Sequence, residues 1–140
     1  PVRRRQGLER ACREAGINPD TLTHYYMEYG DAHYRDMPAR VLAHIMQGKP
    51  QFDAVICGND RIAFMVYQTL LAQGLKIPQD VAVLGYDNMV GLGDLFLPSL
   101  STVQLPHYEI GRLSALHIIN GDKHRETVRV ASPWLPGESI

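Results

Sequence analysis

The stretch Phe52-Asp-Ala-Val-Ile-Cys-Gly-Asn-Asp60 decides the fold, because a short apolar run here stops at a glycine and two polar residues. A run of this length, bounded by polar residues and glycine, is typical of a buried parallel strand. Apolar residues then recur with helical spacing at Ile62, Ala63, Val66, Tyr67, Leu70 and Leu71. The stretch therefore predicts a strand over 54–58 that feeds a helix over 60–73, with Asp60 as the helix N-cap.

A second unit of the same kind follows at Val81-Ala-Val-Leu-Gly-Tyr-Asp-Asn88. Its strand, 81–85, also ends at a pair of polar residues. Ligands bind outside the carboxyl ends of strands in open α/β sheets. The two polar pairs, Asn59-Asp60 and Asp87-Asn88, therefore predict a site for a small polar molecule.

Strand and helix patterns alternate along the rest of the chain. Further helices are predicted over 3–15, from Pro38 to the residue before Gly48, and over 106–119. Further strands are predicted over 22–27, 101–104 and 126–131. The tail from Trp134 is expected to be irregular. This alternation predicts an α/β fold with a doubly wound, mostly parallel sheet and helices on both faces. Because such a sheet usually begins with a strand and this chain opens on a helix, we expect the chain to be part of a longer protein.

Composition excludes several classes of protein. The 140 residues are 45% hydrophobic, enough for one globular core, and the net charge of −1 does not suit a nucleic-acid-binding face. No apolar run reaches membrane-spanning length and no signal-peptide pattern is present.

The two cysteines, Cys12 and Cys57, are far apart and are predicted to be buried thiols in a reducing cytoplasm. The six histidines lack metal-ligand spacing, and no nucleophile motif or phosphate loop occurs, so no metal, cofactor or catalysis is predicted.

Three polar residues are candidates for ligand binding, and each also has a purely structural interpretation. Asn59 carries an amide that suits hydroxyls or ring nitrogens, but Asn-Asp also caps helices. Asp87 can accept charge-assisted hydrogen bonds, but Asp-Asn also favours an Asx-turn. One arginine of Arg3-Arg-Arg5 could grip a ligand oxygen through two parallel N–H bonds, but a short basic run is usually a solvated face.

The chain also carries a large motif set that resembles a known family. The sequences FDAVICGNDRIAFMVYQTLLAQGLKIPQDVAVLGYDN, LPSLSTVQLPHYEIG and RRRQGLERACREAGI are similar to the effector-binding domain of the lactose-repressor (LacI/GalR) family of bacterial transcription regulators. The resemblance implies a periplasmic-binding-protein-like (type I) fold of two α/β lobes with the effector in the cleft. It further implies that residues 1–104 and 126–140 form mainly the C-terminal lobe without its first, central strand, while helix 106–119 belongs to the other lobe and leaves an apolar face uncovered.

Site residues follow from the resemblance position by position. Arg4, Asn59 and Asp87 match the family's cleft arginine, asparagine and acid. Asp60, Ala32 and His33 are expected near the ligand, although Ala32 stands where the family often has a stacking aromatic residue. Leu105 in place of a usual Gln and Gly137 in place of a common Arg are further departures.

A subunit contact is implied as well. The apolar stretch 89–100 is interrupted by glycines, which fits either core or a subunit contact, and the outer face of helix 60–73 is also apolar. The family uses both segments for dimerisation. The contact is therefore expected at Ile62, Val66, Leu92, Leu95 and Phe96.

The resulting prediction is the effector-binding and dimerisation portion of a bacterial repressor that senses a sugar or sugar derivative. Operator DNA would be read by an N-terminal headpiece outside this chain, as a homodimer or higher. Sugar, sugar phosphate and nucleobase all stay open as effectors. The alternatives are a periplasmic sugar-binding protein of a transport system and a flavodoxin-like enzyme, because one fold serves all three.

Overall fold

The computed structural model describes residues 2–24, 36–43, 45–46, 49–90, 92, 95–121 and 127–140. The chain divides into two units, Pro1–Asp36 and Met37–Ile140, which we describe separately.

The first unit contains one long helix. Helix α1 (Val2–Glu14) ends at Gly16, whose φ of +74° is the left-handed conformation that glycine adopts without steric cost. The short 3-10 helix η1 (Pro19–Thr21) follows, and Cys12 is buried on α1. The predicted helix over 3–15 is confirmed. Of the strand predicted over 22–27, the first three residues are irregular and the others lie outside the described residues.

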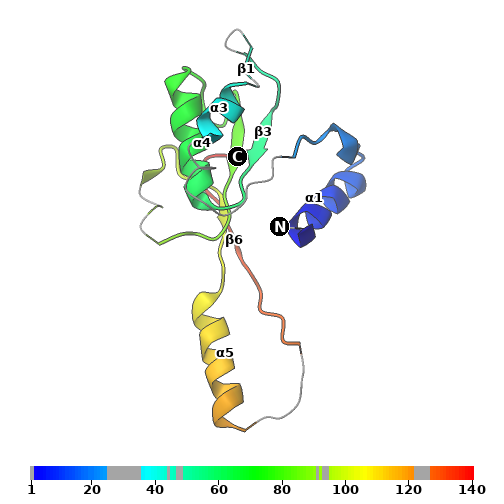
Figure 1. The fold of residues 1–140 in the computed structure, drawn as a ribbon, viewed down its shortest axis with the longest axis vertical. Helices are drawn as coiled ribbons and strands as arrows, with labels where there is room; N and C mark the ends of the chain where they lie inside the picture. The colour runs from blue at the N-terminus through cyan, green and yellow to red at the C-terminus, as the bar shows by residue number, and fades with distance from the viewer. Residues whose placement is uncertain are drawn as a thin grey trace. The chain divides into compact units, whose positions relative to one another are not determined.

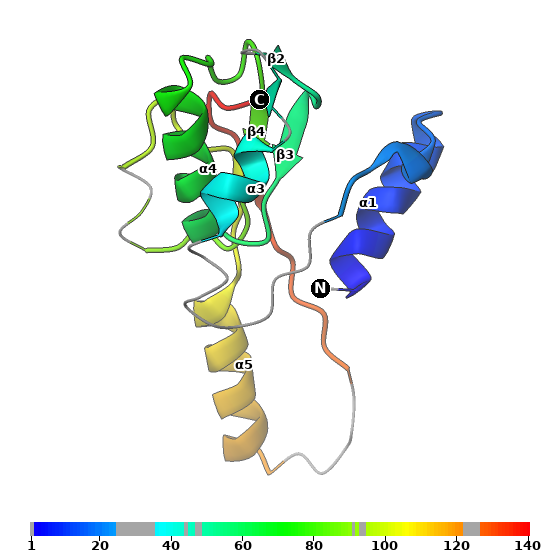
Figure 2. The ribbon, with the colours of Figure 1, turned by 45° about the horizontal axis from the view of Figure 1, so that its top comes forward.

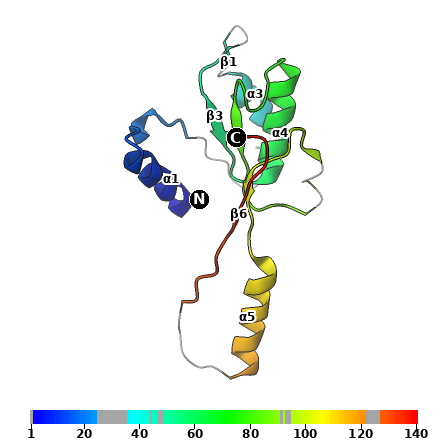
Figure 3. The same ribbon diagram turned by 180° about the vertical axis from the view of Figure 1, so that it is seen from behind.

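A small sheet organises the second unit (Figures 1 and 2). Its strands are β3 (Ala54–Ile56), β4 (Ala82–Leu84), β5 (Thr102–Val103) and β6 (Trp134–Leu135). β3 and β4 are parallel, with Val55 opposite Val83. β5 runs parallel to β4 on its other side, through isolated bridges at both ends of β5. β6 pairs antiparallel with β5 (Figure 3). The predicted parallel arrangement is therefore confirmed for β3, β4 and β5, while β6 is antiparallel.

Helix α4 (Asp60–Ala72) packs on this sheet, and helix α3 (Met37–Leu42) packs on α4 (Figure 1). The buried side chains of α4 follow the predicted apolar face: Ala63, Val66, Tyr67 and Leu70. Val81, just before β4, and Val83, within it, are also fully buried. Phe96 joins this core with its ring edge-on to Tyr67, at 4.9 Å between ring centroids. Burial of this face explains why the segment is helical, since packing supplies most of a short helix's stability.

Two predictions of secondary structure are wrong. The helix from Pro38 ends at Leu42, and Ile45–Met46 instead forms strand β1, which pairs with β2 (Lys49–Pro50). The strand predicted over 126–131 is not formed by residues 127–130, and the last strand is β6 in the tail that was expected to be irregular. Alternating residues form a strand only where a neighbour accepts their hydrogen bonds, and β5 offers its edge at Trp134–Leu135.

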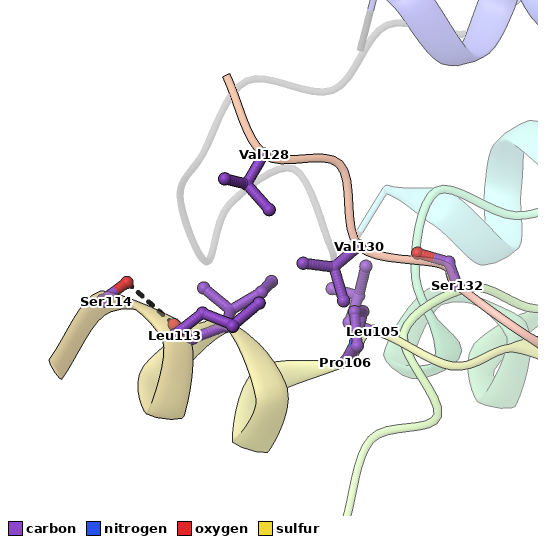
Figure 4. A pocket seen from close by; sticks show the side chains of 8 residues that line it. Leu105, Pro106, Leu113, Ser114, Val128, Val130 and Ser132 are labelled. Carbon is purple, nitrogen blue, oxygen red and sulfur yellow. Dashed lines mark hydrogen bonds between the residues drawn. The ribbon is translucent and has the colours of Figure 1, made fainter. Parts of the chain in front are cut away.

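Helix α5 (His107–Ile119) confirms the helix predicted over 106–119, and none of its residues is buried. Near its start it borders a shallow pocket of about 310 Å³ (Figure 4). The pocket is lined by Leu105, Pro106, Ile110, Leu113, Ser114, Val128, Val130 and Ser132. These side chains carry no charge, so the pocket does not coincide with the polar residues at the strand ends. The helix does leave an apolar face uncovered, as predicted.

The C-terminal segment is joined to the sheet by serine hydroxyl groups. Ser139 is fully buried, and its Oγ donates to the Val83 carbonyl at 2.6 Å while accepting from the Ser101 N–H at 2.8 Å. The Ser101 hydroxyl in turn accepts from the Gly137 N–H at 3.0 Å. A Cβ on Gly137 would lie 2.5 Å from the Leu100 carbonyl carbon, so this close backbone approach requires glycine.

Cys57, at the end of β3, gives a testable consequence of this core. Burial, aided by the negative charge of Asp60, raises the pKa of its thiol from 9.0 to about 12. Because the thiolate is the reactive form, we expect about a thousandfold less reaction with Ellman's reagent at pH 8 than for the free peptide 52–60. The measurement uses the natural polypeptide with its other cysteines replaced by serine. Equal rates for folded protein and peptide would show that Cys57 is not buried.

Candidate functional site

The site lies where β3 and β4 end. Asn59 comes three residues after β3 and Asp87 three residues after β4. Because the two strands are parallel neighbours, their carboxyl ends lie at the same edge of the sheet (Figure 2). The prediction that the two polar pairs share one edge is therefore confirmed.

The capping residue of α4 differs from the prediction. Asn59, with extended backbone at φ −161°, is the N-cap, and its side-chain oxygen accepts from the Ile62 N–H at 2.9 Å. Asp60 is instead the first residue of the helix. Either side chain suits a cap, so the residue type does not choose between them. The choice follows from Asp60 having other hydrogen-bond partners inside the unit.

Asp60 is buried, with 3% of its surface exposed, and both of its carboxylate oxygens are engaged. Oδ1 accepts from the Thr102 hydroxyl at 2.8 Å, and Oδ2 accepts from the Met89 N–H at 3.0 Å. A carboxylate removed from water without such donors would be strongly destabilising. Its position in the first turn of α4 is also favourable, because the helix dipole is positive there. Asp60 thus joins the start of α4, the loop after β4 and strand β5.

The backbone of Asp87 has an uncommon conformation. Its φ is +101°, and the next residue, Asn88, has φ +48°. Such conformations cost non-glycine residues roughly 1–3 kcal/mol and persist only where the surroundings hold them. Here the Asp87 N–H donates to the Val103 carbonyl at 2.9 Å, and the Asp87 carbonyl accepts from the Leu105 N–H at 3.4 Å. Segment 103–105 therefore holds the Asp87 backbone through both its N–H and its carbonyl group.

The carboxylate of Asp87 is only partly satisfied. Its Oδ1 is buried and has no hydrogen-bond partner among the described residues. Burial is the main cause that raises its pKa above the ordinary 3.8, and the negative charge of Asp60 adds to this. Backbone N–H groups of Asp60 and Met89, and positive charge on His107, act in the opposite direction. A buried acceptor of this kind is suited to receive a hydrogen bond from a ligand.

The remaining predicted ligand residues are Arg4, Ala32, His33 and Asp60. Arg4 is exposed on α1, in the first unit, and its part in the site stays a prediction. Ala32 and His33 lie outside the described residues. Asp60, expected near the ligand, turns its carboxylate into the core.

The residues expected at a subunit contact divide into two groups. Val66 has no exposed surface and Phe96 is buried, so both belong to the core of the unit and the expectation that they face a partner is corrected. Their side chains pack within the protomer because the same helical face that carries Val66 covers the sheet. Leu95 is 56% exposed, and Ile62 and Leu92 are half-buried, so these three stay candidates.

The family description "Periplasmic binding proteins and sugar binding domain of LacI family" matches residues 2–135. The chain belongs to this family. The resemblance to the lactose-repressor family is thereby confirmed, and the fold is periplasmic-binding-protein-like, as predicted.

Named relatives agree with this assignment. The sucrose operon repressor of Escherichia coli is 54% identical over 132 residues, which are 94% of this chain and 40% of the repressor. The ribose operon repressor of Escherichia coli is 38% identical over 119 residues, which are 81% of this chain and 33% of that protein. The chain thus spans well under half the length of these relatives.

Solved structures of the family have the same fold. A LacI family transcriptional regulator from Silicibacter pomeroyi superposes with a TM-score of 0.79 at 28% identity, over 98% of this chain and 49% of that one. A LacI family regulator from Enterococcus faecium with bound ribose gives a TM-score of 0.76 at 26% identity, over 95% and 48% of the two chains.

Sequence reasoning missed Thr102 and Gly85. The motif Pro-x-Leu-Ser-Thr-Val includes Thr102, but nothing in its spacing identifies a partner 42 residues away. Within the described part of the chain, no three His, Cys, Asp or Glu side chains are placed to hold a metal ion. None of the described helices has the length and apolar character needed to cross a membrane.

Gly85 tests the packing around Asp60. A Cβ on Gly85 would overlap the Asp60 carboxylate and would lie 2.6 Å from the Leu100 Cδ2 atom. We expect Gly85→Ala to lower the free energy of unfolding by about 1–3 kcal/mol, as for other overpacked sites. Gly111→Ala is the control, because a Cβ there meets nothing within 4 Å and alanine favours the helix. Urea denaturation of both variants measures the effect; equal stability of the two would contradict the proposed packing.

The raised pKa of Asp87 predicts a pH-dependent stability difference. Because the folded state binds the Asp87 proton more tightly than the unfolded chain, this group's contribution to stability is full below pH 3.8 and is lost as pH rises through the raised pKa. We expect Asp87→Asn to melt at a higher temperature than the wild type at pH 7, by a margin that shrinks toward pH 4. Thermal melting across this range measures it. A margin that is constant with pH would contradict the assignment to Asp87.

Proposed function

We propose that this chain is the effector-binding and dimerisation portion of a bacterial transcriptional repressor that senses a neutral sugar. Membership of the family supports a ligand-binding role. The 54% identity to a sucrose operon repressor and the 38% identity to a ribose operon repressor favour repression and a sugar effector. A role as an enzyme is not proposed, because these relatives are repressors.

The observation that carries this proposal is the state of Asp87. Two consecutive residues with positive φ present a carboxylate whose buried Oδ1 has no partner among the described residues. Strained backbone and an unsatisfied buried acceptor are both uncommon in proteins and are concentrated at functional sites. A sugar hydroxyl that donates to Oδ1 would satisfy the acceptor and remove its desolvation cost.

Charge favours a neutral sugar over a sugar phosphate at this edge. The carboxylates of Asp60 and Asp87 lie close enough for the charge of Asp60 to raise the pKa of Asp87. A phosphate beside them would add a like charge and could offer no proton to an ionised carboxylate at neutral pH. Hydroxyl groups donate to carboxylates in short, charge-assisted bonds.

Asn59 and Arg4 complete the proposed site. The oxygen of the Asn59 amide accepts from the helix, so the NH₂ group would be the part of this side chain that donates to a ligand oxygen. Arg4 would grip a further oxygen with two parallel N–H bonds. In this scheme residues 1–104 and 126–140 belong mainly to the C-terminal lobe and α5 to the other lobe, with the effector between them.

Regulation then follows from differential binding. An effector that contacts both lobes favours the arrangement in which its contacts are complete, and it shifts the equilibrium only by its difference in affinity. DNA-reading headpieces elsewhere in the polypeptide would respond through a homodimer, with Leu95 and the half-buried Ile62 and Leu92 at the contact. A repressor of this kind acts in the cytoplasm, where operator DNA is found.

A periplasmic sugar-binding protein of a transport system is the second candidate, because the family description includes such proteins. It predicts sugar binding without any effect on DNA. Release of operator DNA by the sugar that binds distinguishes the repressor from this alternative.

The proposal predicts a ligand-dependent rise in melting temperature of the natural polypeptide that carries this chain. The panel contains sucrose, fructose, glucose and ribose, their phosphate esters, adenine and guanine. At a hundredfold excess over the dissociation constant, one neutral sugar should stabilise the protein by about 2.7 kcal/mol. The rise should be absent in Asp87→Ala, which removes the proposed acceptor.

Three results would count against the proposal. No shift with any compound, in a protein that melts cooperatively, would refute the sugar-binding site. A shift with a phosphate ester alone would refute the argument from charge. An equal shift in Asp87→Ala would place the ligand elsewhere.

A further inference from the structure

Asp60 is joined to the proposed effector site without being available to an effector itself. Its carboxylate is buried, and both oxygens accept hydrogen bonds from within the unit, from Thr102 and Met89. Because only 3% of its surface is exposed, a ligand could reach this carboxylate only if the packing around it shifted. Its influence on a ligand must therefore act through neighbouring residues.

One of these neighbours is Asp87, whose pKa the charge of Asp60 raises. The Met89 N–H that Asp60 accepts is two residues along the same loop, so this bond fixes the loop that carries Asp87. Backbone N–H groups of both Asp60 and Met89 also favour the ionised Asp87 carboxylate. The two carboxylates are thus held at the start of α4 by one set of backbone groups.

The second hydrogen bond of Asp60, from the Thr102 hydroxyl, connects it to the strand that binds the Asp87 backbone. Thr102 begins strand β5, and the next residue, Val103, accepts the Asp87 N–H at 2.9 Å. The Thr102 hydroxyl therefore ties the helix start to the strand that holds the Asp87 backbone. The Asp60 carboxylate packs against Gly85 so closely that a Cβ at that position would overlap it.

We propose that Asp60 is a positioning residue of the effector site, which acts through Met89 and Thr102 to hold Asp87 with Oδ1 directed at the effector. This inference rests on the proposed function, because it assigns a role within the same site. In this proposal the Asp87 carboxylate contacts the effector, and the Asp60 carboxylate holds Asp87 in position.

The test removes the Thr102 hydroxyl in the natural polypeptide. Thr102→Val keeps the side-chain volume and deprives Asp60 of one donor. Thr69→Val is the matched control: Thr69 is a buried threonine of the same unit, and its hydroxyl donates to the Met65 carbonyl on α4, away from Asp60. The probe is whichever of sucrose, fructose, glucose and ribose gives the largest melting shift, and its dissociation constant is measured by calorimetry.

We expect Thr102→Val to weaken binding of this sugar by about tenfold, in line with the loss of one hydrogen bond to a charged group. Thr69→Val should bind like the wild type. Thr102→Ser, which restores the hydroxyl, should recover most of the affinity. A purely structural role for Thr102 would instead change the melting temperature and leave the dissociation constant unaltered.

Asp60→Ala provides a second arm if Thr102→Val does not fold, because it removes the acceptors of both the Met89 N–H and the Thr102 hydroxyl. Weaker sugar binding by this variant supports the positioning role, and wild-type affinity overturns it. Wild-type affinity in Thr102→Val also overturns it. Failure of the wild type to bind any sugar refutes the proposed function instead, so the two failures are distinguishable.

Discussion

The second unit depends on satisfying one buried carboxylate. Asp60 is removed from water at the start of α4, and a charge in that position is stable only with donors on both oxygens. The donors come from the loop after β4 and from the first residue of β5. The helix, the loop and the strand therefore have to meet at one point. Gly85 is required beside it because any larger residue would occupy the same space as the carboxylate.

The proposed function depends on the contrast between this carboxylate and that of Asp87. Asp60 has partners for both oxygens, while Asp87, on strained backbone, has one buried oxygen with no partner among the described residues. Stability alone would favour a relaxed and satisfied residue at position 87. Strained backbone and an unsatisfied acceptor are local costs that proteins carry at ligand sites, which supports the role proposed for Asp87. The same edge of the sheet thus combines a structural acid with the acid that we propose for recognition.

Some apolar residues of the second unit are buried in its core, and others are exposed and are candidates for a subunit contact. Val66 on α4 is fully buried, and the Phe96 ring packs edge-on against Tyr67. Apolar character alone does not distinguish these residues from Leu95, which is exposed. The two groups differ only in how the stretch after β4 turns back toward α4, which is a tertiary property.

The parallel pair β3 and β4, helix α4 and the edge that carries Asn59 and Asp87 could all be predicted from the order of the residues. Those features follow from apolar periodicity and from the rule that parallel strands present their carboxyl ends together. Three other features emerge only from the folded chain: Asn59 caps the helix, Asp60 is buried and the last strand is Trp134–Leu135. Capping and strand pairing depend on partners distant in the chain, and local pattern carries no information about which donors those partners will place nearby.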